Sequence, residues 1–317
     1  LLVDAGGFGY NSNAGIIYNA NTFAVNYIHV SESAPNMVPS ALNTYDKRID
    51  NTSQTNVVYG QIQRSVDDAS ANDYLNVSAH TFTEQVEIHK AVTLAGQGSG
   101  LTTILSPNTL PLSFSTGPLN KPVIYVHDTS DVIIKDLTVD GAGKGNANYR
   151  FQGIAFRNAG GTVRGCEVKD IRETPINGNQ HGVGIYAFAD NGTPRMLNVA
   201  QNNIHDFQKN ATVFSGADLT ARIDSNTVTG SGPVSFIAQN GIQLGFGAAG
   251  SIRNNAISNI SYVPSTAVAC GILLYQSAGP DTASSNVLTG CQMGIYYIDV
   301  GGLISENIIN STAVNTG

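Results

Sequence analysis

The stretch from Val123 to Asn310 repeats one short signature six times: GIAFRN at 153–158, GIYAF at 184–188, ATVFSG at 211–216, GIQLGF at 241–246, GILLYQ at 271–276 and GIYYID at 294–299. Successive copies, with the third counted from Thr212, begin 23 to 31 residues apart. A second signature, polar–Asn–x–aliphatic, follows most copies: QNNI at 201–204, SNTV at 225–228, NNAI at 254–257, SNVL at 285–288 and ENII at 306–309. Self-similarity at this period predicts a solenoid built from stacked rows.

Each row divides into three short strands. The first begins at the Gly-Ile pair, the second is the aliphatic run before the Asn, and the third follows the Asn-x-aliphatic step. Only 12% of the residues are charged, against a norm near 25%, which leaves little room for long amphipathic helices. We interpret one Asn per row as a ladder whose amides donate to the neighbouring rung, rather than as a glycan or metal site: Asn202, Asn226, Asn255, Asn286 and Asn307.

The segment Gln61–Ala69 changes period. Ile62, Val66 and Ala69 fall at i, i+4 and i+7, which predicts a short helix with one apolar face. Such a helix would cover the open N-terminal edge of the solenoid, whose unpaired strand groups otherwise invite aggregation. Residues 1–60 form an N-terminal extension or cap whose fold the sequence does not specify.

The block QIQRSVDDASANDYLNVSAHTFTEQVEIHKAVTLAGQGSG, at 61–100, resembles the opening of right-handed parallel β-helix proteins of the pectin-lyase-like superfamily. The resemblance covers Gln61 to about Asn310. It implies an all-β fold: a right-handed parallel β-helix over residues 61–317, with three strands per rung and a short N-terminal capping helix. It does not specify a reaction, because that superfamily holds lyases, hydrolases, esterases, epimerases and non-catalytic surface proteins.

Charge and cysteine content bound the partners. A net charge of −7 argues against nucleic acid, and no apolar run approaches the ~20 residues of a transmembrane helix. Cys270 and Cys291 occupy similar places in successive rows, so a disulfide and two buried free thiols both remain open. Cys166 stands where other rows have Asn, and we expect a buried free thiol there.

Enzymes that this chain resembles usually work on the face made by the first strand of each rung. If Ile154, Ile185 and Val213 point inward, the residues after them point outward. Eight outward residues are then candidate ligand contacts: Tyr125, His127, Arg157, Tyr186, Phe188, Phe214, Tyr275 and Tyr296. Three interpretations stay open: stacking on sugar rings, a protein interface, or a one-residue slip of the alignment that places the column in the core.

This face carries hardly any charge. It lacks the paired carboxylates of a hydrolase and the two Asp and one Arg of the esterases that share this fold. The densest ionisable cluster lies in the loops 140–152 and 169–183, and the catalytic candidates come from it: Asp140, Arg150, Asp170, Arg172, Glu173 and His181. In a lyase or epimerase His181 would be the base, and Arg150 or Arg172 would hold the substrate carboxylate. The alternative is a solvated, salt-bridged pair of loops.

The sequence therefore favours a secreted or cell-surface module with a structural, adhesive or glycan-contacting role. The alternative is a carbohydrate-active enzyme, a polysaccharide lyase or epimerase more than a hydrolase, acting in the groove on the first-strand face. The expected partners are a polysaccharide or neighbouring protein subunits, in an extracellular or cell-surface setting. No cofactor is expected, and Ca²⁺ would be needed only by a lyase.

Overall fold

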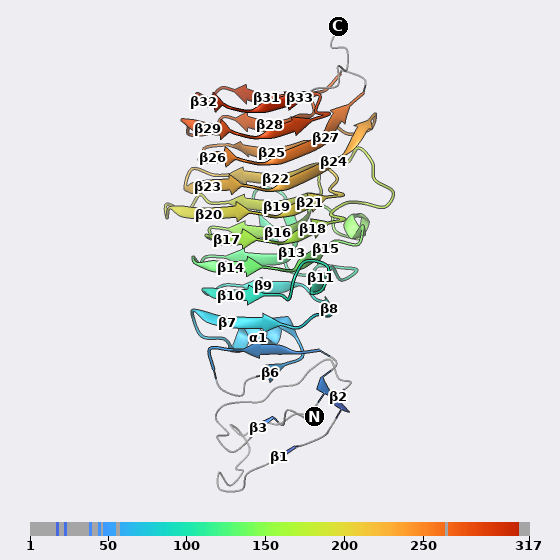
Figure 1. Ribbon diagram of the computed structural model, residues 1–317, viewed down its shortest axis with the longest axis vertical. Helices are drawn as coiled ribbons and strands as arrows, with labels where there is room; N and C mark the ends of the chain where they lie inside the picture. Colours follow the sequence, from blue (N-terminus) through green and yellow to red (C-terminus); the bar gives the residue numbers. More distant parts are fainter. Residues whose placement is uncertain are drawn as a thin grey trace.

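A computed structural model describes residues 47–54, 58–263 and 266–310, and the backbone of four two-residue strands before them. Those strands form two small parallel pairs, β1 (Ile17–Tyr18) with β3 (Val38–Pro39) and β2 (Thr22–Phe23) with β4 (Thr44–Tyr45). The rest of the described chain winds into a column of stacked rungs with three sheets along its length (Figure 1). Each predicted row contributes one strand to each sheet.

The first sheet holds the Gly-Ile strands, and its neighbours pair in parallel except at one end, where β12 pairs antiparallel with β13. Its members are β9 (Val86–Ile88), β12 (Phe114–Ser115), β13 (Leu119–His127), β16 (Phe151–Arg157), β19 (Val183–Phe188), β22 (Asn210–Ser215), β25 (Asn240–Gly245), β28 (Cys270–Tyr275) and β31 (Met293–Ile298).

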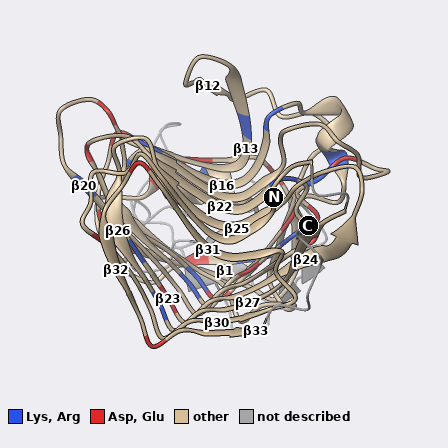
Figure 2. Ribbon diagram, turned by 90° about the horizontal axis from the view of Figure 1, so that it is seen from above, with Lys and Arg blue, Asp and Glu red and all other residues tan. Residues whose placement is uncertain are grey.

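The second sheet holds the aliphatic strands: β5 (Ile49–Asn51), β6 (Val58–Tyr59), β7 (Asp73–Val77), β10 (Val92–Ala95), β14 (Val132–Lys135), β17 (Gly161–Arg164), β20 (Arg195–Ala200), β23 (Leu219–Asp224), β26 (Ala249–Arg253), β29 (Asp281–Ser284) and β32 (Gly302–Ser305). The third sheet holds the strands after the Asn step: β8 (Thr81–Thr83), β11 (Thr103–Leu105), β15 (Thr138–Asp140), β18 (Glu167–Lys169), β21 (Asn203–His205), β24 (Thr227–Val234), β27 (Ala256–Tyr262), β30 (Val287–Thr289) and β33 (Ile308–Asn310). Seen along the column, the three sheets enclose one interior (Figure 2).

The glycine that opens most rows sits where the chain turns into the first sheet. A Cβ added at Gly153 would lie 2.5 Å from the carbonyl oxygen of Gly184 and 2.8 Å from Cγ1 of Val168. A Cβ at Gly184 would lie 2.6 Å from the carbonyl oxygen of Ala211, on the next rung. Glycine is needed here because the rungs approach too closely for a side chain, so the row signature has a steric cause.

The predicted asparagine ladder is confirmed. The side-chain oxygen of Asn226 accepts the backbone N–H of Asn202 at 3.0 Å and its side-chain N–H at 2.9 Å. Asn226 in turn donates to the side-chain oxygen of Asn255 and to the carbonyl of Val199. The pattern continues through Asn286 to Asn307. These contacts satisfy the polar groups of a buried turn without water.

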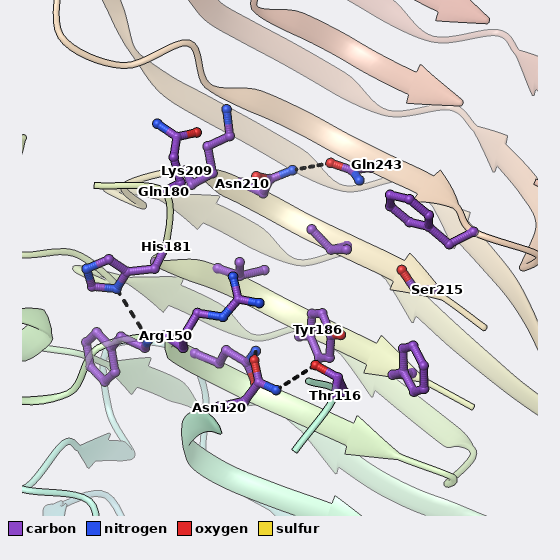
Figure 3. Close-up of a pocket in the computed structure, with 17 residues that line it drawn as sticks. Thr116, Asn120, Arg150, Gln180, His181, Tyr186, Lys209, Asn210, Ser215 and Gln243 are labelled. Atoms are coloured by element: carbon purple, nitrogen blue, oxygen red, sulfur yellow. Dashed lines mark hydrogen bonds between the residues drawn. The ribbon is translucent and has the colours of Figure 1, made fainter. Parts of the chain in front are cut away.

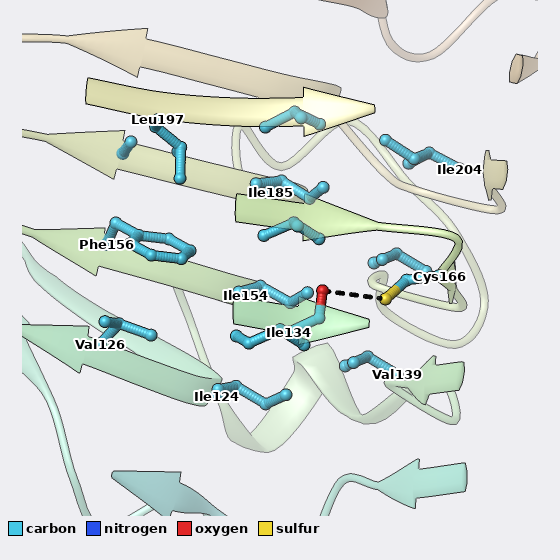
Figure 4. Packing of buried hydrophobic residues seen from close by; sticks show 14 of the residues in the cluster. Ile124, Val126, Ile134, Val139, Ile154, Phe156, Cys166, Ile185, Leu197 and Ile204 are labelled. Carbon is cyan, nitrogen blue, oxygen red and sulfur yellow. Dashed lines mark hydrogen bonds between the residues drawn. The ribbon is translucent and has the colours of Figure 1, made fainter. Parts of the chain in front are cut away.

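The interior is filled by aliphatic side chains in register from rung to rung. Ile124 pairs with Ile154 and Ile154 with Ile185, and all three are fully buried (Figure 4). Cys166 is a buried free thiol, as predicted, and lies 3.7 Å from the carbonyl oxygen of Ile134. Cys270 and Cys291 are also buried free thiols, so of the two alternatives the structure has the unbridged one.

The predicted capping helix is present as α1 (Ile62–Asp68), and its side chains Ile62 and Val66 are fully buried. Beside it, β5 pairs antiparallel with β7 and extends the second sheet, so part of the first 60 residues joins the solenoid. A short 3-10 helix, η1 (Lys144–Ala147), lies in one of the two long loops. Within the described part of the chain, no helix is long and apolar enough to cross a membrane.

Candidate functional site

A pocket of about 500 Å³ lies on the outer face of the first sheet, across β16, β19, β22 and β25 (Figure 3). Thr116 and Asn120 close one side, from the β12–β13 hairpin that stands away from the column in Figure 2. The lining consists of Thr116, Asn120, Arg150, Phe151, Gln152, Gln180, His181, Gly182, Val183, Tyr186, Phe188, Lys209, Asn210, Val213, Ser215, Gln243 and Phe246. Its volume suits a small ligand or a short stretch of polymer.

Aromatic rings reach this pocket from β19 and from the end of β25, two rungs further along the sheet. Tyr186 and Phe188 alternate with buried residues along β19, and burial raises the pKa of the Tyr186 hydroxyl. The Arg157 guanidinium lies 4.9 Å from the centre of the Phe188 ring. Phe246 follows β25 and is 53% exposed, with its ring 5.1 Å from that of Tyr275. An exposed ring beside a polar cavity is a surface on which another flat, partly apolar group can stack.

Side-chain amides line the start of the same strands. Gln152, Val183 and Asn210 stand in register on three neighbouring rungs. The Gln152 amide N–H donates to the side-chain oxygen of Asn120 at 2.9 Å, and the Asn210 amide donates to that of Gln243 at 2.8 Å. The side-chain oxygen of Gln152 is buried and accepts no hydrogen bond from the described residues. The pocket therefore holds an unused acceptor.

The pocket lining has two positively charged side chains and no negatively charged one. Arg150 and Lys209 line it, and none of the 17 lining residues is Asp or Glu. The buried Nε of Arg150 has no hydrogen-bond acceptor, and Arg150 forms no ion pair with any residue that the structure describes. Burial lowers the pKa of the Lys209 ammonium, whose nearest polar contact is the carbonyl oxygen of Ala238.

His181 lines the pocket, but both of its ring nitrogens are engaged by neighbouring residues. Its Nε2 lies 2.9 Å from Oε1 of Glu173, and its Nδ1 accepts the backbone N–H of Phe151 at 3.4 Å. Burial alone would raise the pKa of Glu173, but hydrogen bonds from Asn177, His181 and Asn179 outweigh burial and lower it. With Nδ1 as acceptor, Nε2 carries the proton and donates to a carboxylate. In this geometry His181 holds the loop 169–183 against β16 and offers no free base.

The remaining catalytic candidates lie outside the pocket lining. Arg172 forms an ion pair with Asp170 at 2.8 Å. Asp140 accepts the backbone N–H of Ala142 at 2.7 Å, and burial, together with the nearby Asp170 and Glu167 carboxylates, raises its pKa. Of the six residues predicted as a catalytic set, the structure brings only Arg150 and His181 into the pocket.

One predicted ligand contact is wrong. Phe214 is fully buried and pairs in register with Ala187, whereas Val213 points outward and lines the pocket. The alignment slipped in this row because Thr212 fills the inward position that Ile185 fills on the rung before. Because Thr212 is polar, the apolar pattern of this row begins one residue later than the inward position does. A slip of one residue exchanges the two faces of a strand.

The other predicted contacts lie on the outer face as expected. Tyr186 and Phe188 line the pocket, whereas five others lie on the same face beyond it: Tyr125, His127, Arg157, Tyr275 and Tyr296. The Tyr125 ring stacks between Phe114 of the hairpin, 5.0 Å away, and His127, 4.6 Å away. Arg157 pairs with Asp190 at 2.6 Å. These contacts continue the aromatic character of the pocket toward the N-terminal end.

Comparison with known proteins identifies the architecture. No protein-family model matches the chain, and no curated protein matches it in sequence. Among solved structures, a pectin methylesterase in complex with a hexasaccharide superposes with a TM-score of 0.50, at 10% sequence identity, over 84% of this chain and 89% of that one. The chain is a right-handed parallel β-helix.

Two further β-helices align less closely. The A-module of the Azotobacter vinelandii mannuronan C-5 epimerase AlgE4 has a TM-score of 0.36 and 14% identity, over 79% of this chain and 90% of that one. An alginate lyase from Paenibacillus has a TM-score of 0.32 and 13% identity, over 79% and 96%. At 10% identity, the likeness to the pectin methylesterase establishes the β-helix fold alone.

Several pocket residues escaped the sequence interpretation. Gln152 and Asn210 immediately precede the row-opening positions Gly153 and Ala211, outside the alternating strand on which we counted inward and outward residues. Lys209 lies one residue earlier, in the loop that closes a rung. The sequence could have indicated these residues through the position just before each row start, because a β-helix stacks such positions into one column.

Proposed function

We propose that this β-helix is an extracellular or cell-surface module that binds a glycan in the first-sheet pocket without cleaving it. The supporting features are exposed and half-buried aromatic rings for stacking on sugar rings, beside amides that can hydrogen-bond hydroxyl groups. The structural similarity to a pectin methylesterase that holds a hexasaccharide supports a glycan-related role in general terms. The low content of charged residues favours the extracellular setting, which surface labelling of the producing cell would test.

The observation that carries the proposal is the composition of the lining. It offers aromatic rings, amides and hydroxyls, and none of the 17 residues is a carboxylic acid. Glycoside hydrolysis ordinarily uses two carboxyl groups on opposite sides of the scissile bond. A pocket without them can bind a saccharide chain but lacks that acid–base pair.

The test is binding of a panel of oligosaccharides to the wild-type protein and to Phe246→Ala, by calorimetry. Phe246 is 53% exposed, so its removal should leave the fold intact and weaken binding several-fold, because a stacking partner is lost. Phe236→Ala is a matched control, since Phe236 is 41% exposed and outside the pocket lining. Equal losses for both variants, or binding by neither the wild type nor the control, would reject the proposal.

A second candidate, a polysaccharide lyase, is favoured by one observation. Burial lowers the pKa of Lys209, which raises the fraction of uncharged amine that can remove the proton beside a uronate carboxylate. The electron pair of that C–H bond would form the C4–C5 double bond, and the glycosidic oxygen would leave with a proton from the Tyr186 hydroxyl. If absorbance of an unsaturated product appears with the wild type and disappears in Lys209→Gln, the lyase replaces the binding module.

A further inference from the structure

The second sheet forms a different side of the column from the pocket, and its middle strands carry an excess of positive charge. The strands β14, β17, β20, β23 and β26 contain one acidic residue, Asp224, and five basic ones: Lys135, Arg164, Arg195, Arg222 and Arg253. The whole chain has the opposite balance, with 16 basic and 23 acidic residues. Figure 2 shows basic residues in blue along the wall formed by β20, β23 and β26. A surface with one sign of charge attracts ligands of the opposite sign.

Three of these arginines are exposed and unpaired. The side chains of Arg164, Arg222 and Arg253 form no hydrogen bond or ion pair with any residue that the structure describes. Each follows a buried residue of its strand, so the alternation of the strand directs it outward. Elsewhere in the described chain, four arginines are paired with an aspartate: Arg48, Arg64, Arg157 and Arg172. The three unpaired guanidinium groups are therefore available to a ligand.

The other charged residues of these strands have partners within the protein. Oδ1 of Asp224 accepts the Ser225 hydroxyl at 2.6 Å and the Asn254 amide at 3.1 Å, although Asp224 stands in register with Arg253. Lys135 forms an ion pair with Asp136 at 3.6 Å, and Arg195 donates to the Ser130 hydroxyl at 2.7 Å. The charge that this face offers to solvent is therefore mainly that of the three arginines.

The strand register fixes how far apart these arginines lie. Arg164 is in register with Ala200, Ala200 with Asp224, and Asp224 with Arg253, so three rung steps separate Arg164 from Arg253. At ~4.8 Å per rung, the arginines span about 14 Å along the column. The residues beside and between them are neutral hydrogen-bonding groups: Asn198, Thr220 and Ser251. One small anion cannot reach all three arginines, whereas an extended chain with spaced anionic groups can.

We propose that this face, which we call the arginine face (Arg164, Arg222 and Arg253 with the side chains between them), binds a sulfated polysaccharide laid along the column. A guanidinium is more weakly hydrated than an ammonium group and forms paired hydrogen bonds to oxyanions. A sulfate ester spreads one charge over three oxygens, so it gives up its water more readily than a carboxylate at an exposed site. The sugar hydroxyls between the sulfates then face Asn198, Thr220 and Ser251, which can donate and accept hydrogen bonds.

Two other polyanions fit the arginine face less well. An anionic membrane surface is bound through charge together with buried apolar area. On these five strands Met196 is the one exposed large hydrophobic side chain, which gives little area to insert. A linear polyphosphate carries a charge on every unit, whereas on this face neutral side chains separate the cations.

The experiment uses the full chain and measures binding to dextran sulfate, to carboxymethyl dextran of the same length and degree of substitution, and to unmodified dextran. Linear polyphosphate and phosphatidylserine vesicles complete the panel. We expect dextran sulfate to bind most tightly and unmodified dextran not to bind at this face. The affinity for dextran sulfate should fall steeply as NaCl is raised, because the contacts are exposed and ionic.

The double variant Arg164→Gln/Arg222→Gln should weaken binding of dextran sulfate by roughly 3- to 30-fold, as expected for two exposed charge contacts. It should also make the dependence on NaCl shallower, which a merely structural effect would not do. Lys169→Gln/Arg172→Gln is the matched control, because it removes the same charge from residues outside the second sheet that are paired with Glu167 and Asp170. The charge-conserving variant Arg164→Lys/Arg222→Lys should keep part of the affinity, since it retains the charge and loses the paired hydrogen bonds.

Each contrary outcome overturns a defined part of the proposal. Equal losses in the two glutamine double variants would remove the site from the arginine face. Tighter binding of carboxymethyl dextran, polyphosphate or the vesicles would overturn the choice of a sulfated chain. Failure of dextran sulfate to bind rejects the proposal, and it leaves untouched the glycan binding of the pocket, which the oligosaccharide panel and Phe246→Ala test separately.

Discussion

Replacing Asn226 by alanine tests the asparagine ladder at its centre. Asn226 is 1% exposed. Its side-chain oxygen accepts from the backbone N–H and the side-chain N–H of Asn202, and its own N–H groups reach Asn255 and the carbonyl of Val199. Alanine removes all of these bonds at once and leaves the Asn202 donors facing a void.

The size of the effect follows from the groups left unpaired. Two buried N–H donors of Asn202 lose their acceptor, and each unpaired donor costs about 1–3 kcal/mol, so we expect a loss of about 2–6 kcal/mol in the free energy of unfolding. Asn203→Ala is the control, since Asn203 is exposed and its side chain has no hydrogen-bond partner among the described residues. The control should change stability by less than about 0.5 kcal/mol.

The assay is guanidinium denaturation followed by circular dichroism, with hydrogen exchange at the Asn202 amide as the local readout. The exchange rate matters because solenoids unfold in parts, and one midpoint can hide a local opening. Faster exchange at Asn202 in Asn226→Ala, and not in Asn203→Ala, is the expected result. If the two variants lose equal stability and exchange alike, the ladder does not stabilise the rungs as argued.

Three further results are expected. Gly153→Ala should destabilise the protein by about 1–3 kcal/mol in thermal melts, because its Cβ would meet the carbonyl oxygen of Gly184 at 2.5 Å, whereas Gly301→Ala, with open space around it, should not. Burial raises the pKa of the Cys166 and Cys270 thiols to about 12, so a thiol reagent at neutral pH should label neither until denaturant is added, and labelling of the native protein would contradict the burial. Burial lowers the pKa of His205, but hydrogen bonds to Asp206 and Glu167 outweigh burial and raise it, so its stabilising contribution is complete below the ordinary histidine value of ~6.5 and is lost as pH rises through the folded-state pKa. His205→Gln should flatten that part of the stability curve, and an unchanged slope would count against the assignment.

Much of the fold could be predicted from the sequence because each rung of the solenoid has the same steric and hydrogen-bonding requirements. Gly153 and Asn226 each have counterparts on other rungs, so a local steric or hydrogen-bonding need appears as a pattern along the chain. The sequence also predicted the capping helix, because Ile62 and Val66 form one apolar face. The prediction was wrong in the row of Thr212. Because this buried residue is polar, the inward and outward positions were assigned one residue out of register, and Phe214 was placed on the outer face.

The site was less predictable, because function here depends on contacts between loops that do not repeat. His181 and Glu173 were both catalytic candidates in the sequence, with His181 as the base, yet the fold buries them against each other and leaves no free base. Arg150 looked equivalent to Arg172 in the sequence. Only the structure shows that Arg172 is paired with an aspartate, whereas Arg150 forms no ion pair with the residues that the structure describes.

By itself, the sequence determined the rungs, the buried ladders and the N-terminal cap, since each depends on residues at fixed spacing along the chain. The tertiary structure alone decided which side chains meet on the outer face: Lys209, Gln152 and the hairpin residue Asn120 are distant in sequence and join in one pocket. The physical reason is that stacking places residues of separate rows a single rung apart, while loop conformation, which no period fixes, decides which of their charges remain unpaired.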